Sequence, residues 1–559
     1  MWFEELQEVA EVFKGNFPLT CLMLIPILIF IAPSQAAHEF EAYRMQHFDL
    51  NGRQYGSRSS LINMEARPLS ASKVPRRCLI AKLSELSAER YQELVSESAG
   101  ALVVLIPQNF SAMPQEGLKQ WLKVEPQMLE LETNMAVYFV REDETLLQIH
   151  NDIQQAATGD QADSAAEALL SAVYANGFQM VATGPQSKQV KDAQIISMEG
   201  KLTGKGIEDQ LPTIAIVTHY DSFGIAPYLS YGVDSNGSGV AAFMELVRLF
   251  SRLYTNSRTH AKYNLLFFLS GGGKFNYQGT KRWIEDNLEV HDMSLLADAE
   301  YVICLDSVGG SDSLHLHLSK PPKEGTLPYE ILQNFRSAAR DLYPSFNFSM
   351  VHKKINLADE MLAWEHERFS IRRLPAGTIS HLPSHRNIYR TSVADERWRV
   401  ESSSLTRNVR IMAEGLARQI YSLQNNGVNG APEIFDNEFS VSEENLEAWV
   451  EYLSSNPRPA QLMAKDHPVV VTLEQGLSKY LKDVKRHSFK ADKREPEFVF
   501  FDGLKSTMHA YNVKPAVFDL FLAGAIASYV GIVYLFLQNF HHVENLIRGL
   551  SPKPKGKVH

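Results

Sequence analysis

Four short polar clusters in the middle of the chain contain the residue types with which proteins bind ligands and catalyse reactions. The clusters lie at the ends of three apolar runs that are predicted to be β-strands, or in the loop that follows the first of these strands. They are His219 with Asp221, residues 234–238, residues 271–274, and Asp306. In parallel α/β sheets, ligands bind at the carboxyl ends of the strands. We therefore expect a functional site where these four clusters meet.

The third cluster belongs to the stretch SGGGKFNYQGT, which contains three glycines and a lysine but no acid. Glycine permits positive φ and close backbone approach, in phosphate-binding loops as well as in ordinary turns. A phosphate-binding loop places Ser or Thr directly after its lysine, whereas Phe275 follows Lys274 here. We therefore do not predict such a loop.

The elements that position these clusters form an α/β pattern. Apolar strands alternate with helices, and this pattern predicts a mainly parallel sheet that is covered on both faces. The strands are expected at 213–222, 263–269 and 301–310, and the helices at 240–254 and 280–288. We assign this sheet to a domain over residues 185–425.

Two further segments flank this domain. Residues 38–175 alternate short apolar runs with amphipathic segments and predict a smaller α/β domain. Residues 426–513 are predicted to be helical, without a strand partner. The predicted fold class is therefore α/β, with a small N-terminal α/β domain and a C-terminal helical segment.

Residues 1–36 are predicted to be a secretory signal peptide. An apolar stretch over 17–33 precedes small residues at positions 34 and 36, as a signal-peptidase site requires. Four glutamates outnumber Lys14 in the leader, where positive charge is usual. An uncleaved membrane anchor therefore remains the alternative.

Residues 515–540 are predicted to be a transmembrane helix, because 520–537 contain no charged residue. Basic residues in the tail over 541–559 place that tail in the cytosol. The expected topology is single-pass type I, with the N-terminal bulk lumenal. The final residues KGKVH have the form of an address for retrieval to the endoplasmic reticulum, although a merely solvated tail is the alternative.

Other sequence features agree with a lumenal location. Three N-glycosylation triplets begin at Asn109, Asn236 and Asn347, and Asn236 is the least favourable because a helix is predicted to start there. Cys78 and Cys304 can form at most one disulfide. The formal net charge of -10, without a long basic patch, excludes a nucleic-acid binder.

The motifs THYDS, NGSG, CLDSVG and LPAGTISH, in this order, resemble the zinc aminopeptidase-like fold of peptidase family M28. The resemblance covers roughly residues 190–425. It implies a site in which active members hold two zinc ions through a His, a bridging Asp, a Glu of a Glu-Glu pair, a strand-end Asp and a late His. The first Glu of the pair acts as general base.

Three of these ligand positions, and the acid that supports the first ligand, have a counterpart here. Carried over by motif, His219 matches the first ligand and Asp221 its supporting acid. Asp306 matches the strand-end Asp. His385 is the best match to the late His, with His381 as a rival.

The remaining positions lack their usual acids. The bridging position falls on Ser235, unless the alignment slips by one residue to Asp234. The Glu-Glu pair falls on Gly273 and Lys274, and residues 246–284 contain no carboxylate that could replace it. Catalytic zinc normally needs three protein ligands, and Lys274 adds a repelling charge. The resemblance therefore implies an inactive homologue without metal or cofactor, whose remaining polar residues form a hydrogen-bond network.

An inactive lumenal peptidase-like domain on one C-terminal span resembles the related nicastrin and nicalin groups. Local stretches such as SGGGKFNYQGTKRW and KYLKDVKRHSFKADKREPEFVF are closer to the nicalin group, and the resemblance runs from about residue 37 to 538. It implies a non-catalytic scaffold subunit of an endoplasmic reticulum membrane complex. The implied partners are the Nodal modulator protein and a small multi-span membrane protein.

The same resemblance links that complex to the Sec translocon and, indirectly, the ribosome during biogenesis of multi-pass membrane proteins. It also links the group to restraint of Nodal signalling. Two other functions stay open at this point: an active zinc aminopeptidase, and a lumenal receptor that binds peptides in the inherited cleft.

Overall fold

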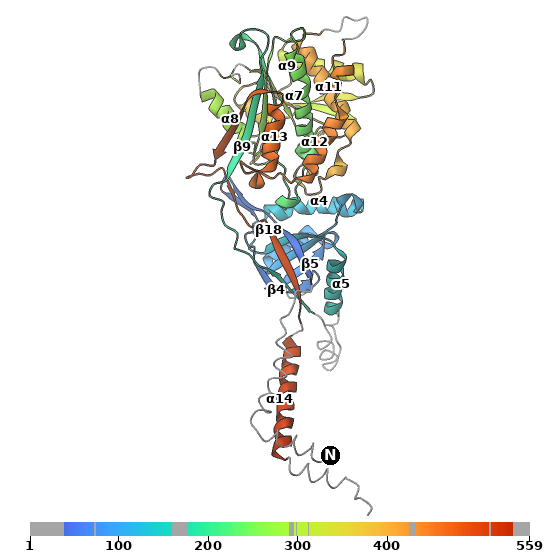
Figure 1. Ribbon diagram of the computed structural model, residues 1–559, viewed down its shortest axis with the longest axis vertical. Helices are drawn as coiled ribbons and strands as arrows, with labels where there is room; N and C mark the ends of the chain where they lie inside the picture. The colour runs from blue at the N-terminus through green and yellow to red at the C-terminus, as the bar shows by residue number, and fades with distance from the viewer. Residues whose placement is uncertain are drawn as a thin grey trace, which may run out of the picture.

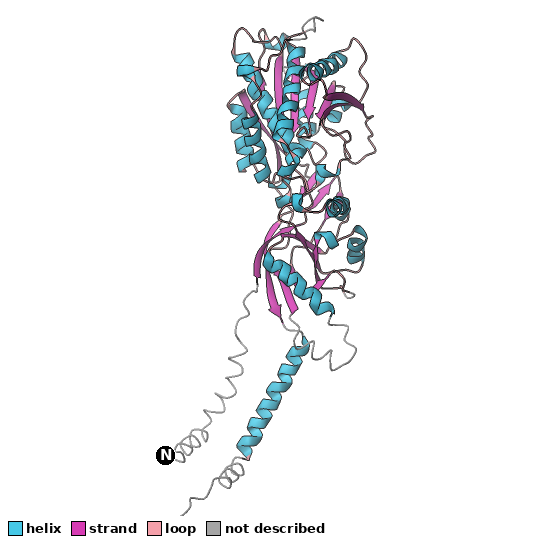
Figure 2. Cartoon of the chain, turned by 90° about the vertical axis from the view of Figure 1, so that its right-hand side faces the viewer, coloured by secondary structure: helices cyan, strands magenta, loops and turns pink. Residues whose placement is uncertain are grey.

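The computed structural model describes residues 38–71, 74–158, 177–289, 294, 296–297, 299–310, 312–423, 432–513 and 516–539. The predicted signal peptide over 1–36 and the predicted tail over 541–559 lie outside these residues. The molecule is elongated, with a large helix-covered sheet at one end, a β-barrel in the middle and helix α14 (Ala516–Gln538) at the other end (Figures 1 and 2).

The large sheet has eight strands in the order β14-β13-β15-β12-β10-β11-β9-β16. Strands β15, β12, β10 and β11 form the parallel centre, whereas β9, β16 and the β13–β15 pair add antiparallel ladders. The sheet is therefore mixed, and the prediction of a mainly parallel sheet holds for its centre. The bounds are β9 Gln194–Leu202, β10 Thr213–His219, β11 Asn264–Ser270, β12 Ala299–Leu305, β13 Ser313–Leu318, β14 Asn347–His352, β15 Ala376–Ser380 and β16 Lys482–Lys490.

Helices cover both faces of this sheet, which explains why β10 and β11 are buried along their whole length. One face packs against α7, α9, α11, α12 and α13, and the other against α8 and α10. The strand and helix order predicted between residues 213 and 310 is confirmed. The bounds are α7 Gly239–Thr255, α8 Gln278–Glu289, α9 Leu327–Leu342, α10 His366–Ile371, α11 Ser402–Ile420, α12 Glu443–Ser455 and α13 Pro468–Ser478.

The smaller domain is a closed barrel in the strand order β1-β18-β8-β4-β5-β6-β7. The alternation of strands and helices predicted within residues 38–175 is present between 78 and 158, but the barrel also needs β8 and β18 from outside residues 38–175. The bounds are β1 His38–Arg44, β4 Ile62–Pro68, β5 Cys78–Lys82, β6 Ala101–Ile106, β7 Ala136–Arg141, β8 Gly177–Ala182 and β18 Lys505–Val513, with helices α3 Ala88–Ser96, α4 Gln115–Glu130 and α5 Glu144–Thr158.

The prediction that residues 426–513 are helical without a strand partner is wrong for the second half of that segment. Strand β16 pairs with β9, and β18 enters the barrel between β1 and β8. Strand β17 (Phe498–Phe500) joins β2 (His47–Leu50) and β3 (Arg53–Gly56) in a small third sheet. In β18 only Met508 and Ala510 are buried. Most other positions are polar, so the sequence does not show the alternation of apolar and polar residues by which a strand is predicted.

The barrel domain and the large sheet meet at α4 (Figure 1). Glu125 on α4 is 1% exposed, and its Oε1 atom accepts hydrogen bonds from the backbone N–H groups of Ile225 (3.1 Å) and Val393 (2.9 Å). The hydroxyl of Ser392 donates to the other carboxylate oxygen. Burial raises the pKa of Glu125 to about 7. One carboxylate thus fastens α4 to two loops of the larger domain.

Helix α14 follows β18 and extends away from the barrel (Figures 1 and 2). Across the residues that the structure describes, no helix combines the length and the apolarity that a bilayer crossing requires. The span predicted over 515–540 includes positions outside this description, namely residues 515 and 540 and the side chains of 516–519, 521 and 536–537.

Candidate functional site

The structure brings the four polar clusters together at the carboxyl ends of β10, β11 and β12. The side chain of Asn236 ties the first strand end to the third. Its Nδ2 donates to Thr218 Oγ1 (2.7 Å) and to the carbonyls of His219 (3.0 Å) and Leu305 (2.9 Å), and its Oδ1 accepts from the N–H of Ser307 (3.0 Å). The clusters therefore form one continuous buried network.

Asp306, at the end of β12, forms a buried ion pair with Arg390. The Asp306 side chain is 1% exposed and that of Arg390 11%. Arg390 also donates to the carbonyl of His385 (3.0 Å) and lies over the ring of Trp364 at 4.4 Å. Burial alone would raise the pKa of Asp306, but the charge of Arg390 outweighs it and holds that pKa well below its ordinary value. An internal cation thus neutralises this carboxylate.

Lys274 places a second cation beside the segment 234–238. Its Nζ donates to Ser235 Oγ (2.6 Å) and to the carbonyl of Arg390 (3.1 Å). Burial lowers the pKa of Lys274 to about 8, against the opposing charges of Asp306 and Asp221. Ser235, the residue predicted at the family's bridging position, therefore accepts a hydrogen bond from lysine.

The glycine run explains how Lys274 reaches this place. The backbone N–H groups of Gly273 (2.7 Å) and Lys274 (3.0 Å) both donate to the carboxylate of Asp221. A Cβ atom at Gly273 would lie 2.4 Å from the Cβ of His219, so a side chain cannot be accommodated there without movement. Burial raises the pKa of Asp221, and the charge of His219 opposes this shift. The run is a tight turn around Asp221.

His219 faces Glu365, a residue that the sequence analysis did not assign to the site. His219 Nδ1 lies 3.4 Å from Glu365 Oε2, and Ser270 Oγ donates to Glu365 Oε1 (2.7 Å), as does the hydroxyl of Thr280. His219 Nε2 is buried and has no hydrogen-bond partner among the described residues. The first ligand position is therefore held by a carboxylate from a distant loop.

His381, the rival of His385 for the family's late-histidine position, contacts a carboxylate of the cluster. His381 Nε2 lies 2.7 Å from Asp234 Oδ2. The other carboxylate oxygen of Asp234, Oδ1, accepts hydrogen bonds from Ser238 Oγ and from the backbone N–H of Gly309, both at 3.1 Å. The charge of Asp234 raises the pKa of His381 against the effect of burial. His385 does not share this hydrogen bond, and burial lowers the pKa of His385 to about 4.

Asp395 holds the backbone of the loop over residues 234–238. Its two oxygens accept hydrogen bonds from the backbone N–H groups of Asp234 (3.1 Å) and Ser235 (2.8 Å). Burial and the neighbouring charge of Asp234 raise the pKa of Asp395 to about 7. Asp395 therefore fixes the backbone of the segment 234–238 rather than facing a ligand.

These contacts test whether the site fits a dinuclear zinc centre. The described residues contain no group of three or more His, Cys, Asp or Glu side chains arranged to hold a metal ion. Asp306 is paired with Arg390, and Ser235 accepts from Lys274. Two positive charges next to two dications would be strongly repulsive. The residues present do not fit the metal centre of the active peptidases.

The glycosylation triplets differ in accessibility. Asn109 is exposed at the start of a short 3-10 helix, and Asn347 is exposed at the start of β14. Asn236 is 0% exposed and all its polar atoms are engaged within the site. The folded chain therefore does not present Asn236 to a glycosyltransferase, and the predicted glycosylation at this position conflicts with the structure. Cys78 and Cys304 are both buried and free.

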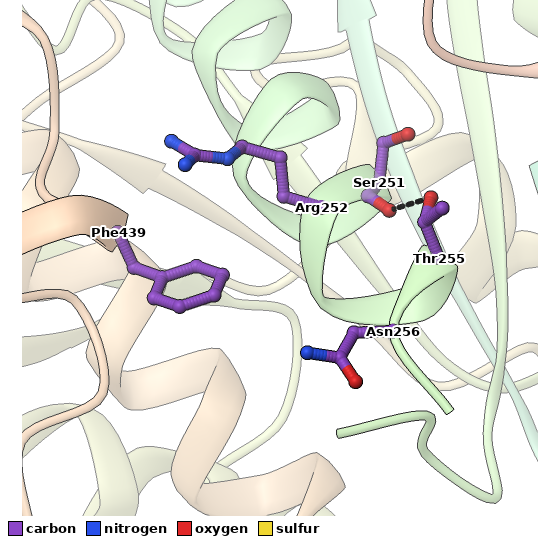
Figure 3. A pocket seen from close by; sticks show the side chains of 5 residues that line it. All are labelled: Ser251, Arg252, Thr255, Asn256 and Phe439. Carbon is purple, nitrogen blue, oxygen red and sulfur yellow. Dashed lines mark hydrogen bonds between the residues drawn. The ribbon is translucent and has the colours of Figure 1, made fainter. Parts of the chain in front are cut away.

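A cavity of about 350 Å³ lies at the other end of α7 (Figure 3). It is lined by Ser251, Arg252, Thr255, Asn256 and Phe439. At 1.5 Å per residue, the helix separates this cavity from Ser238 by about 25 Å. The guanidinium carbon of Arg252 lies 5.1 Å from the centre of the Phe439 ring. The cavity is thus remote from the cluster at the strand ends.

Comparisons with known proteins agree with this geometry. Residues 200–414 match the family described as Peptidase family M28. The crystal structure of the γ-secretase component nicastrin has the same fold, with a TM-score of 0.60 at 11% identity over 84% of this chain and 99% of that chain. At this identity the likeness concerns the fold alone.

Closer relatives align over the whole chain. A zebrafish (Danio rerio) protein named BOS complex subunit ncln is 53% identical over 100% of both chains. The human (Homo sapiens) protein named BOS complex subunit NCLN is 52% identical over 98% of this chain and 100% of its own length. A Caenorhabditis elegans protein named Nicalin is 26% identical over 97% of this chain. The chain therefore belongs to the nicalin family, also named BOS complex subunit NCLN.

Proposed function

We propose that this protein is a non-catalytic scaffold subunit of a membrane complex. The observation that carries this proposal is the pair of internal cations: Arg390 neutralises Asp306, and Lys274 donates to Ser235 at the family's bridging position. Peptide hydrolysis by this family requires a general base beside a metal-bound water. Neither of these two cation contacts provides such a base. The relatives' name, which describes a subunit of a BOS complex, supports the assembly role.

We further propose that this complex resides in the endoplasmic reticulum membrane and is linked to the Sec translocon and to biogenesis of multi-pass membrane proteins. The proposed partners are the Nodal modulator protein and a small multi-span membrane protein, and restraint of Nodal signalling is a further proposed effect. These proposals rest on membership of the nicalin family. The structure supports them with a large folded body that precedes α14.

We propose residues 515–540 as the membrane anchor, with a type I orientation. The support comes from the absence of charge over 520–537 and from the basic tail that follows. Leu520 (75%), Ile532 (67%) and Tyr534 (63%) of α14 are exposed, which is unfavourable in water and favourable in lipid. Alkaline carbonate extraction of membranes tests the anchor, because an integral protein stays in the pellet.

The scaffold role is tested by three measurements on the purified full chain in detergent. We expect no stoichiometric zinc after incubation with the metal, no release of amino acids from aminoacyl anilides, and an unchanged thermal midpoint in chelator. Bound zinc with chelator-sensitive hydrolysis would establish a peptidase instead. Saturable binding of free peptide N-termini, abolished by His219→Gln, would establish a peptide receptor. For a scaffold, His219→Gln leaves partner recovery from membranes unchanged.

A further inference from the structure

Three loops that carry residues of the cluster at the strand ends continue directly to the boundary with the barrel domain. They are residues 221–225 after β10, residues 271–275 after β11, and residues 390–396. Each loop places a polar side chain or a backbone N–H in the cluster and, a few residues later, contacts the barrel domain or the small third sheet. The cluster therefore borders a second domain on this side.

Asp221 ties the first two of these loops together. Its carboxylate accepts hydrogen bonds from the backbone N–H groups of Gly273 (2.7 Å) and Lys274 (3.0 Å). Phe223 and Phe275 follow in the two loops, and the centres of their rings lie 5.7 Å apart with an angle of 70° between the ring planes. One carboxylate thus fixes the spacing of two aromatic residues.

These two phenylalanines pack on the small sheet of β2, β3 and β17. Phe275 is 0% exposed, and the centre of its ring lies 5.4 Å from that of Phe48 on β2 and 4.9 Å from that of Phe500 on β17. The ring centres of Phe223 and Phe48 are 5.9 Å apart. Strand β2 directly follows barrel strand β1 in the chain, and β17 directly precedes barrel strand β18. The aromatic contacts therefore join the cluster to the barrel domain.

The third loop connects Arg390, the partner of Asp306, to the barrel domain. Ser392 donates to Glu125 of α4, which also accepts a hydrogen bond from the first loop. Glu396 is half-buried and accepts from the backbone N–H of Phe110 (3.2 Å) in the barrel domain. A second route thus runs from the cluster to α4 and to the barrel.

We propose that the cluster at the strand ends serves in this chain as the joint that fixes the barrel domain against the large sheet. Asp221 is the positioning residue toward the small sheet, and Arg390 is the positioning residue toward α4. The carboxylate of Asp234, on the other side of the cluster, contacts only residues of the larger domain, among them His381 and Gly309. The proposal depends neither on the proposed complex nor on the membrane anchor.

The opposing explanation is that these hydrogen bonds only satisfy buried polar groups within the larger domain. The two explanations differ in what the loss of Asp221 does. If the bonds serve the larger domain alone, the loss loosens its strand ends or the chain as a whole. If the cluster is a joint, the loss loosens the small sheet while the central strands stay protected, because local opening is confined to elements that lose contacts.

Hydrogen–deuterium exchange of the purified full chain in detergent, read by mass spectrometry, distinguishes the two explanations. The test variant is Asp221→Asn, whose amide accepts from only one of the two N–H groups because its nitrogen is itself a donor. The matched control is Asp234→Asn, the same change at another buried carboxylate of the cluster that accepts a backbone N–H. A further variant, Phe275→Leu, disturbs the joint from the side of the small sheet. It removes no polar group, so it tests the proposal by itself if Asp221→Asn does not fold.

We expect Asp221→Asn to speed exchange about tenfold in β2 and β17 and to leave β11 and β12 unchanged. Phe275→Leu should speed exchange in residues 221–225 as well as in β2 and β17, because coupling between two places acts in both directions. Asp234→Asn should act only near residues 234–238 and 309.

Four results would each overturn the proposal. They are faster exchange throughout the large sheet in Asp221→Asn, unchanged exchange in β2 and β17 in that variant, an equal effect of Asp234→Asn on these two strands, and an effect of Phe275→Leu that does not reach residues 221–225.

Discussion

Two buried cations, Arg390 and Lys274, define the chemistry of the strand ends at the scale of single residues. A buried carboxylate is tolerated when a charge partner and hydrogen bonds compensate its lost hydration. Arg390 provides both for Asp306, because it forms an ion pair and is itself held by carbonyls and by the face of Trp364. The charge of Asp306 is therefore compensated by a cation of the chain itself.

Replacing Arg390 tests this compensation. In Arg390→Met the carboxylate of Asp306 stays buried without its partner, so we expect a loss of about 3–5 kcal/mol in the free energy of unfolding. Denaturant unfolding of the full chain in detergent measures the loss. The exposed neighbour is the control: Arg386→Met should change the stability by no more than about 0.5 kcal/mol. Adding Asp306→Leu to Arg390→Met should recover most of the loss, and a failure to do so would contradict the ion-pair explanation.

The sequence locates half of this cluster. His219, Asp221 and Asp306 directly follow buried strands, so the fold alone predicts where they meet. Arg390 and Glu365 come from loops 84 and 146 residues away from their partners, with no local pattern that marks them. Side-chain pairing over such distances depends on tertiary packing, which also brings His381 rather than His385 against Asp234. What the sequence does show is an absence. The Glu-Glu pair of the active family members is missing, and Gly273 and Lys274 stand at its predicted positions.

At the scale of secondary-structure elements, regular helices and buried strands are predictable, whereas edge and barrel strands are not. Strands β10, β11 and β12 are apolar along their length, so burial on two faces is evident from composition. Strand β16 is half exposed and rich in lysine, and lysine favours helices over strands. What makes β16 a strand is the ladder with β9, which lies almost 300 residues earlier in the sequence.

Glu125 on helix α4 should make the free energy of unfolding depend on pH. Its pKa is raised to about 7 in the fold, so the unfolded chain loses that proton at lower pH. The stabilising effect of the protonated form is therefore complete below about pH 4.5 and is lost as the pH rises to about 7.

Glu125→Gln should remove this part of the pH dependence, because its amide oxygen can still accept from Ile225 and Val393. We expect the variant to be more stable than the wild type at pH 8 by up to about 3 kcal/mol, with a gap that closes toward pH 5. Thermal unfolding at four pH values measures the gap. A constant difference across this range would show that Glu125 does not titrate between the folded and unfolded states.

A second prediction concerns the small residues of helix α14, and it depends on the proposed membrane complex. Gly524, Ser528 and Gly531 share one helix face, and no other atom lies within 4 Å of where a Cβ would stand at either glycine. If neighbouring membrane helices pack there, changing all three to leucine should weaken recovery of membrane partners while insertion is retained. Ala523→Leu with Ala525→Leu, on the flanks of that face, is the control. Equal recovery by both variants would move the contact to the domains that precede α14.

At the scale of the whole molecule, the glycosylation triplets report on which side of a membrane the described body lies. Asn109 and Asn347 are exposed on two different domains, and Asn236 is enclosed. We expect endoglycosidase to lower the apparent mass of the protein made in mammalian cells. Asn109→Gln and Asn347→Gln should each remove part of the shift, and Asn236→Gln should remove none. An unchanged mass after digestion would place these domains in the cytosol.

The closed barrel has a consequence for how the protein is made. Strand β18 lies between β1 and β8, so the barrel needs a segment that a ribosome synthesises more than 300 residues after the other six strands. Until residues 505–513 emerge, β1 and β8 present unpaired edges, which are prone to wrong pairing. The peptidase-like domain is synthesised in the interval and can fold first. The barrel therefore closes last, when the chain that reaches α14 is almost complete.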